Sequence, residues 1–516
     1  MIASLRKQGG FSLTTEKETM LLIGYIAGSL YLLCMIAMSL YGVNAMAMAI
    51  LFIRTKRSLE QEKSMPEPEE WPKVTVQLPV LNEKFLLERL LQSVTKLDYP
   101  ADRLQIQVLE DSTDDTALLS ARLVEEYRAR GINIECVFRT ERGGYKAGNL
   151  KNGLKTATGE LIAIFDADFI PSPDWLRQTV PLFQDPKLGC VQTRRGHTNR
   201  DYNLLTRGQA LAMDAHFIVE QTARSRNQLF MNFNGSAGIW RRSCIEDAGG
   251  WQTDALTEDL DLSYRAQLCG WKMDFLPDVI VPAELPVSVE AFKKQQFRWA
   301  KGSIQVTRKN IKRLFSQPGI PWYKRLGGLL HLTAYLVHPL MIGLFLLTLP
   351  VGLLAPRFFA FFPISILATF GPPMLYALAG ARGTPSLIGR LKILPVITVI
   401  GFGISLNSAI AIFEALIGKD GTFVPTPKLN LTNNRNLTGQ MDRTYLQPIG
   451  PMVWGEIGLS LYALLTIAIL LPRLGWFIAP WMGIYWLGYF YIASFNLYQH
   501  WQAQYSGPSF AINERA

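Results

Sequence analysis

The chain has 516 residues, of which 49% are apolar, and a formal net charge of +10 at pH 7. Long runs without Asp, Glu, Lys or Arg argue against a purely soluble protein, and the length suits one large domain plus a membrane region. The positive charge suits anionic lipid headgroups or a phosphorylated substrate, and no basic low-complexity run or nucleic-acid-binding module is evident, so no nucleic acid partner is expected.

Residues 20–53 form the first charge-free run, as one long helix or a tight pair. A membrane-spanning helix needs about 20 apolar residues. We therefore expect a polar tail at 1–19, a transmembrane helix at 20–54 and a charged linker at 55–72. Because the positive residues Arg54, Lys56 and Arg57 follow this run, the positive-inside rule places the next domain in the cytoplasm.

The segment 73–320 is predicted to be a soluble α/β domain. Its strand candidates are 74–80, 104–110, 132–138 and 161–167. Residues 81–97 and 112–131, between the first strands, have helical periodicity. This alternation favours a parallel sheet flanked by helices, in which ligands bind at the carboxyl ends of the strands.

Two of these strand ends carry acidic residues. Glu110 and Asp111 close the second strand, and Asp166 and Asp168 of FDADF (165–169) follow the fourth. Two carboxylates at i and i+2 can share a divalent cation and the phosphates that it carries. Oxygen ligands suit Mg²⁺ or Mn²⁺. Solvated turn residues are the alternative for such a tripeptide.

Three further motifs carry candidate site residues. RGGYKAGNL (142–150) places Lys146 beside two glycines, where it can neutralise a phosphate, or it is an ordinary helix start. LTEDLDL (256–262) crowds carboxylates around Asp259, and such crowding raises the pKa of a general base; a capped helix start is the alternative. In FNGSAGIWRR (233–242), Trp240 is either a sugar platform or a core residue.

The C-terminal region, 321–516, returns to the membrane. Spanning helices are expected near 326–355, 358–380, 450–472 and 475–498, which makes about five to six helices with the first. Positive residues flank 393–417 on both sides, so we interpret this segment as an interfacial or re-entrant helix, while an ordinary span stays open.

QQFRWAKGS (295–303) lies just before these helices and places Gln295, Arg298 and Trp299 in a Q-x-x-R-W pattern. In this order, LEDSTDD, FDAD, TED at 257–259 and Q-x-x-R-W resemble the processive, membrane-embedded family 2 glycosyltransferases. These include the cellulose synthases and the cellulose-synthase-like glucomannan and glucan synthases. The resemblance implies a cytoplasmic GT-A-type (Rossmann-like) domain in a protein of the plasma (inner) membrane.

The resemblance also implies roles for the site residues. Asp259 is the catalytic base of an inverting, single-displacement transfer. The acceptor-binding residues are Glu258, Gln295, Trp299 and Trp240. The nucleotide-sugar-binding residues are Glu110, Asp111, Lys146, Asp166 and Arg298, and Asp168 with Asp166 holds the cation. Because the family usually has two aspartates where this chain has Glu110 and Asp111, which of the two contacts the base stays open.

GTFVPTPK (421–428), within the loop 418–443, resembles the gating loop of cellulose synthases with an added proline. We hypothesise that Thr426 and Lys428 close over the bound nucleotide sugar.

The expected reaction transfers a hexose from UDP-glucose or GDP-mannose onto a β-1,4-glucan or mannan, with membrane translocation of the product. Transfer of one sugar to ceramide or diacylglycerol is the alternative, and a non-catalytic scaffold is a third reading. Accessory subunits or a homo-oligomer stay open as partners.

Overall fold

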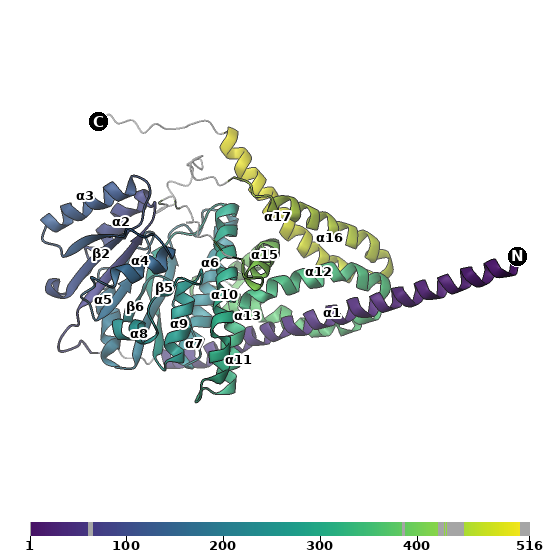
Figure 1. Cartoon of the computed structure of the whole chain (residues 1–516), viewed down its shortest axis with the longest axis horizontal. Coiled ribbons are helices and arrows are strands. Elements are labelled where there is room, and N and C mark those ends of the chain that lie inside the picture. The colour runs from purple at the N-terminus through teal and green to yellow at the C-terminus, as the bar shows by residue number, and fades with distance from the viewer. Residues whose placement is uncertain are drawn as a thin grey trace.

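The computed structural model describes residues 2–59, 66–383, 387–419, 421, 428, 430 and 448–505. An α/β domain lies at one end of the molecule and a bundle of long helices at the other (Figure 1). The chain starts at the far tip of the first helix, well away from the sheet. The predicted fold class, an α/β domain joined to an apolar helical region, is confirmed.

Within the described residues, seven strands form one sheet in the order β3-β2-β1-β4-β6-β5-β7. The strands are β1 Val74–Val80, β2 Leu104–Glu110, β3 Ile134–Phe138, β4 Leu161–Ile164, β5 Leu188–His197, β6 Gly238–Arg241 and β7 Lys272–Ala283. The first four pair in parallel, as predicted. The sheet as a whole is mixed, because β6 runs antiparallel to both β4 and β5. The predicted parallel sheet therefore holds for β1 to β4 and for the pair β5–β7, and β6 is the strand that departs from it.

Helices pack on this sheet through apolar stripes. In α2 (Lys84–Val94), Leu86, Leu87, Leu90 and Leu91 are fully buried and share a core cluster with the strand residues Val76 and Leu78. The spacing of these leucines gives one apolar helical face. The other helices of the domain are α3 Thr116–Ala129, α4 Tyr145–Gly153, α5 Trp175–Thr179, α6 Leu204–Asp214, α7 Thr222–Arg226, α8 Arg242–Asp247, α9 Glu258–Leu268 and α10 Val289–Ser316. A π-helical segment, η3 Ala215–Gln221, joins α6 to α7, and the 3₁₀ turns η1 Ala101–Arg103 and η2 Val180–Gln184 complete the domain.

The helical region contains α1 Ile2–Leu59, α11 Trp322–Leu332, η4 Ala334–Leu336, α12 Val337–Leu354, η5 Pro356–Ile364, α13 Ser365–Gly383, α14 Leu387–Gly403, α15 Ser405–Leu416, α16 Met452–Leu474 and α17 Ile478–Tyr505. In the described part of the chain, four helices are long and apolar enough to cross a membrane, or five if one bent pair counts as a span. α17, which covers the expected span at 475–498, is not among them. The expected polar tail is helical, since α1 continues through residues 2–19 and no proline interrupts it.

The segment 393–417 does not form one straight helix. Lys392–Gly403 and Ser405–Leu416 meet at a bend of 42°, which fits either a broken span or a re-entrant loop. The second half, α15, packs on α10 of the α/β domain through Ala411 and Ile412, which share a cluster with Ala300 and Ile304. This packing joins the membrane helices to the helix that carries the Q-x-x-R-W pattern.

Candidate active site

A cavity of about 910 Å³ lies between the carboxyl ends of the central strands and the membrane helices. Its walls bring together side chains from positions more than 300 residues apart in the sequence. The predicted site residues that line it are Asp111, Lys146, Asp166, Asp168, Glu258, Asp259, Gln295, Arg298, Trp299 and Lys428. The motifs thus meet at one place, as the strand-end argument requires.

Asp166 and Asp168 lie just after β4, and each contacts a lysine. Asp166 Oδ1 is 2.5 Å from Lys146 Nζ, and Asp168 Oδ1 is 2.5 Å from Lys428 Nζ. Asp168 is only 1% exposed, and its Oδ2 accepts a 3.1 Å hydrogen bond from the Glu284 backbone N–H. Burial acts to raise the pKa of Asp168, but Lys428 and Arg195 outweigh it and hold the pKa below its ordinary value. Asp168 therefore stays ionised.

Glu83 is a third carboxylate at this place, and it was not among the predicted site residues. Its side chain follows β1 and lies 3.8 Å from Lys428 Nζ. Burial raises the pKa of Glu83 to about 7, and the neighbouring Asp168, Asp166 and Glu284 add to this effect while Lys428 opposes it. The signal that could have found Glu83 is its place at a strand end, which is the same signal that singled out Asp111 and Asp166.

These side chains fit a divalent cation. Asp166 and Asp168 offer carboxylate oxygens, the ligands that Mg²⁺ and Mn²⁺ prefer, and Glu83 adds negative charge beside them. Among the described residues, no three His, Cys, Asp or Glu side chains converge at metal-ligand spacing. A cation held by one or two carboxylates takes its remaining ligands from a phosphorylated substrate and water.

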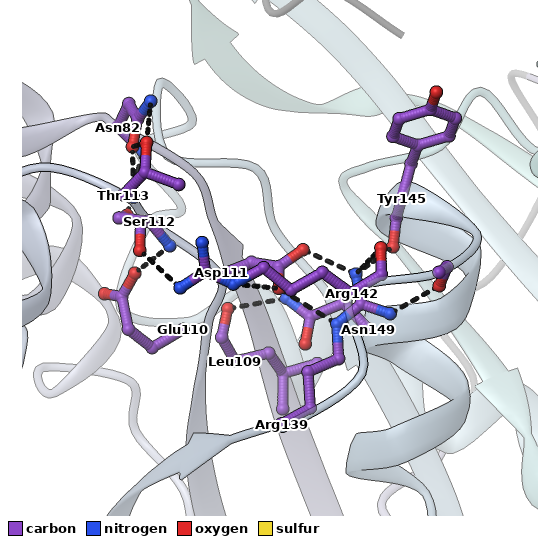
Figure 2. A network of polar contacts seen from close by, with 11 residues as sticks. Asn82, Leu109, Glu110, Asp111, Ser112, Thr113, Arg139, Arg142, Tyr145 and Asn149 are labelled. Carbon is purple, nitrogen blue, oxygen red and sulfur yellow. Dashed lines mark hydrogen bonds and ion pairs between the residues drawn. The ribbon is translucent and has the colours of Figure 1, made fainter. Parts of the chain in front are cut away.

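The acidic pair at the end of β2 divides into two roles (Figure 2). Glu110 is 3% exposed and accepts hydrogen bonds from the Ser112 N–H at 2.7 Å and from the Ser120 hydroxyl. Asp111 lines the cavity instead. Because neighbouring residues at a strand end point to opposite faces, the Glu110 side chain turns toward Ser120 of α3 and does not line the cavity. Asp111 is the member of the pair that faces the cavity.

One guanidinium holds Asp111 in place. Arg139 Nε donates to Asp111 Oδ1 at 2.9 Å and Nη2 donates to Oδ2 at 2.5 Å, a bidentate pair in which both side chains are less than 10% exposed. Arg139 also donates to the carbonyls of Gly143 at 2.6 Å and Tyr145 at 3.0 Å, in the turn that begins α4 (Figure 2). Lys146 follows this turn directly, so Arg139 ties Asp111 to the lysine beside Asp166.

Asp259 lies in the first turn of α9 and has the properties of a general base. Burial first and the neighbouring Glu258 second raise the pKa of Asp259, Lys146 and Arg298 oppose the rise, and the net pKa is about 7. A base with a pKa near the working pH is best suited to proton transfer. Gly235 lies against it with φ +81°, and a Cβ at this position would come within 2.9 Å of Asp259 Oδ2. The Thr257 side chain makes no capping hydrogen bond, so a simple capped helix start does not explain this motif.

Gln295, Arg298 and Trp299 project from α10 into the cavity. The spacing of 295, 299 and 302 places these positions on one helical face. At the last of them, Gly302 lies against Thr257, and a Cβ there would come within 2.6 Å of the threonine Cγ2. The glycine therefore lets α10 approach the segment that carries Glu258 and Asp259.

The predictions for Trp240 and for the loop residues Thr426 and Lys428 have different outcomes. The sugar-platform expectation for Trp240 was wrong, because its ring is 0% exposed and packs against Phe233 and Trp251 in the core. Trp240 is therefore a core residue, which was the alternative interpretation of this motif. Lys428, which lies 260 residues after Asp168 in the chain, donates a hydrogen bond to the Asp168 carboxylate. Thr426, the other predicted loop residue, lies outside the described residues.

The sequence interpretation missed a second group of polar residues in the cavity wall. His216 and Glu220 of η3 contact each other at 3.3 Å, and His216 Nε2 lies 3.0 Å from the Asn234 side-chain oxygen. Asn234 immediately precedes Gly235, whose carbonyl accepts from Lys146. A π-helical turn has no reliable sequence signature, although such turns are frequent at functional sites.

Comparisons with known proteins agree on the class of domain. The family model described as "Glycosyltransferase like family 2" matches residues 72–302. Glucomannan 4-beta-mannosyltransferase 2 of Arabidopsis thaliana is 36% identical over 368 residues, which are 70% of this chain and 68% of that protein. Glucomannan 4-beta-mannosyltransferase 1 of Cyamopsis tetragonoloba is 40% identical over 55% of this chain and 56% of that protein.

Among solved structures, the mannosyltransferase PcManGT from Pyrobaculum calidifontis, in complex with GDP-Man and Mn²⁺, is 24% identical with a TM-score of 0.48. The match covers 75% of this chain and 98% of that one.

Proposed function

Because the chain belongs to glycosyltransferase family 2, together with glucomannan 4-β-mannosyltransferases, we propose that it transfers mannose or glucose from a nucleoside diphosphate sugar to a growing β-1,4-linked mannan or glucan. The names of the relatives favour mannose as the transferred sugar. One observation carries the proposal: a single cavity joins Asp168, Asp259 and Trp299 and continues between the membrane helices.

The donor side of the cavity suits a nucleoside diphosphate. Asp111 is placed to meet the base, and Lys146 and Arg298 add positive charge where the diphosphate lies. Asp166 and Asp168 would hold Mg²⁺ or Mn²⁺. The cation balances the negative charge of the leaving diphosphate when it is bound. Positioning and electrostatics, rather than covalent catalysis, are what these residues supply.

The acceptor side suits a sugar hydroxyl. Trp299 offers an aromatic face for the terminal sugar, and Gln295 and Glu258 offer polar atoms beside it. The acceptor oxygen bonds to the anomeric carbon from the side opposite the diphosphate, the bond to the diphosphate breaks, and Asp259 takes the hydroxyl proton. One such displacement inverts the anomeric configuration and gives a β-linkage from an α-linked donor.

The cavity provides a path for the product toward the membrane. Beyond Trp299 its walls include the aromatic side chains Tyr335, Tyr41, Phe362, Trp481 and Tyr485 of the helical region. Aromatic faces and scattered hydroxyls suit a chain of sugars, which is polar at its edges and apolar on its ring faces. We propose that the growing polymer leaves along this path, with the α/β domain on the cytoplasmic side of the plasma membrane.

The segment 421–428, within the loop 418–443, is proposed to close over the donor. Lys428 contacts Asp168 at 2.5 Å and Glu83 at 3.8 Å, so it already reaches the place where the diphosphate and its cation would lie. Thr426 would act beside it. Deleting 422–428 should abolish turnover while nucleotide binding stays detectable, and unchanged turnover would end this idea.

Product analysis tests the proposed function. The protein in lipid nanodiscs with Mn²⁺ or Mg²⁺ is given radiolabelled GDP-mannose or UDP-glucose, with and without ceramide or diacylglycerol. We expect a polymer that an endo-β-1,4-mannanase or glucanase digests. A single-sugar glycolipid that forms only with added lipid would establish the alternative acceptor. Labelled product that persists in Asp259→Asn protein would reject the assignment of Asp259 as the base.

A further inference from the structure

α10 has a second face that turns away from the cavity. Lys293, Phe297 and Lys301 recur every four residues and therefore lie on one side of the helix. Phe297 packs with α15 residues, and Lys301 Nζ donates to Glu414 Oε2 of α15 at 2.9 Å. The helix that carries Gln295, Arg298 and Trp299 is thus attached to the membrane helices by its opposite face. In Figure 1, α10 lies between the sheet and those helices.

Lys293 forms a buried ion pair on this second face. Its Nζ lies 2.8 Å from Glu456 Oε1 of α16, and the two side chains are 3% and 0% exposed. Glu290 Oε1 lies 3.4 Å from the same ammonium and accepts a 2.6 Å hydrogen bond from Asn496 of α17. The Lys293 carbonyl accepts from Asn407 of α15 at 2.9 Å. One polar cluster therefore joins α10 to α15, α16 and α17 of the helical region.

The start of α10 is also held by α17. Gln499 of α17 accepts from the Val289 N–H at 2.9 Å and donates to the Val287 carbonyl at 3.0 Å. The two partners are backbone groups at the start of α10, six and eight residues before Gln295. These contacts fix where the helix begins relative to the membrane.

A buried ion pair is a costly way to hold two helices together. Removing two charges from water is expensive, and apolar side chains of similar volume commonly give equal or greater stability. What the pair adds is a required partner, because separating two buried charges is strongly unfavourable whereas apolar groups exchange neighbours at little cost. Ionisable residues within membrane helices are costly to bury, and they are therefore candidates for a functional role.

We propose that the Lys293–Glu456 ion pair, supported by Glu290 and Asn496, positions α10 so that Trp299 and Gln295 meet the acceptor in the geometry that transfer needs, while Arg298 stays beside the diphosphate. This inference rests on the proposed function. Lys293 and Glu456 are positioning residues: they act through α10 and not on the sugar. Because a displacement of about 1 Å in a reacting group can cost about 10²-fold in rate, a small shift of α10 suffices to uncouple transfer from donor cleavage.

The experiment compares sugar transfer with donor hydrolysis in full-length protein in nanodiscs. Transfer is measured as labelled polymer, and hydrolysis as nucleoside diphosphate released without acceptor. Hydrolysis needs the donor side alone, so the ratio of the two rates reports acceptor positioning. Lys293→Met/Glu456→Met removes both charges and keeps side-chain volume. Glu456→Gln removes one charge, keeps the shape, and decides the matter if the double variant does not fold.

We expect the transfer-to-hydrolysis ratio to fall about tenfold or more in the double variant, and less in Glu456→Gln, because hydrolysis depends on α10 through Arg298 only. The matched control is Lys272→Met, which removes a lysine paired with Asp185 at 2.9 Å where both side chains are exposed. Its ratio should equal that of the wild type. Transfer and hydrolysis that fall in equal proportion, or an unchanged ratio in a folded variant, would overturn the inference. A wild-type protein that turns over no nucleotide sugar would instead overturn the proposed function.

Discussion

The donor half and the acceptor half of the cavity are built in different ways. The donor half consists of short segments that follow β1, β2 and β4, so Glu83, Asp111 and Asp166 each owe their place to the end of a strand. The acceptor half consists of α9, α10 and membrane helices, whose relation depends on tertiary contacts such as Lys293–Glu456. The comparison teaches that donor chemistry is encoded locally, whereas acceptor geometry is encoded by packing between two regions of the protein.

The largest effect is expected at the junction of the two halves. Asp259→Asn should lower transfer by about 10²–10⁴-fold, because the general base is lost. Nucleotide binding should stay close to that of the wild type, since the donor contacts are intact. Initial rates of polymer formation and the affinity for nucleoside diphosphate are the measurements. The control is Asp254→Asn, whose carboxylate is exposed and pairs with Lys309. Equal losses in both variants would contradict the role of Asp259.

A large effect confined to the donor half is expected for the cation. Chelation with EDTA should stop both transfer and hydrolysis, and Mn²⁺ or Mg²⁺ should restore them. Asp168→Asn should lower both rates by about 10²–10³-fold and raise the metal concentration needed for half-maximal activity. A titration of activity with Mn²⁺ in both proteins checks this. Full activity in the presence of EDTA would remove the cation from the proposed donor half.

Two tryptophans separate activity from stability. Trp299→Ala should raise the acceptor KM or lower transfer by about tenfold through lost stacking, with thermal stability nearly unchanged. Trp240→Ala should lower the free energy of unfolding by about 3–5 kcal/mol, because it empties a core position. Thermal unfolding and acceptor kinetics of the two variants are compared side by side. A stable, acceptor-deficient Trp240→Ala protein would reverse the assignment made here.

The smallest effect concerns pH. The pKa of Asp259 is raised to about 7, and the ionised form is the active base. Activity should therefore be full above pH 7 and decline as the pH falls through 7. Because Glu258 raises this pKa, Glu258→Gln should move the acidic limb of the kcat/KM profile to lower pH. An acidic limb that does not move, in a variant that still turns over, would separate Glu258 from the base.

Much of the donor half could be predicted from the sequence. The predicted strands 74–80 and 104–110 match β1 and β2, and the motifs resembling family 2 glycosyltransferases led to the family and enzyme class that the comparisons confirm. Glu110 could not be told from Asp111, because the choice depends on which face of the strand end each side chain takes. The strand β6 was missed, since four residues after a glycine-rich turn carry little periodicity.

The acceptor half was less accessible to sequence reasoning. Trp240 and Trp299 are both tryptophans beside arginines, and only the packing shows that one is in the core and the other in the cavity. The pairing of His216 with Glu220 occurs in a π-helical turn that the sequence does not reveal. Glu456 pairs with Lys293, which lies 163 residues earlier in the chain. Long-range contacts of this kind leave no local pattern.

The Arg139 network has a consequence for the thermodynamics of donor binding. Its guanidinium holds both Asp111 oxygens and the carbonyls that shape the turn before Lys146. With the proposed donor roles of Asp111 and Lys146, the contacts for the base and for the phosphate would be ordered together before the ligand arrives, so less conformational entropy would be lost on binding. The nucleotide would meet one preorganised network instead of two independent contacts. A change of the preferred base would then have to keep the Arg139 hydrogen bonds or replace all of them together.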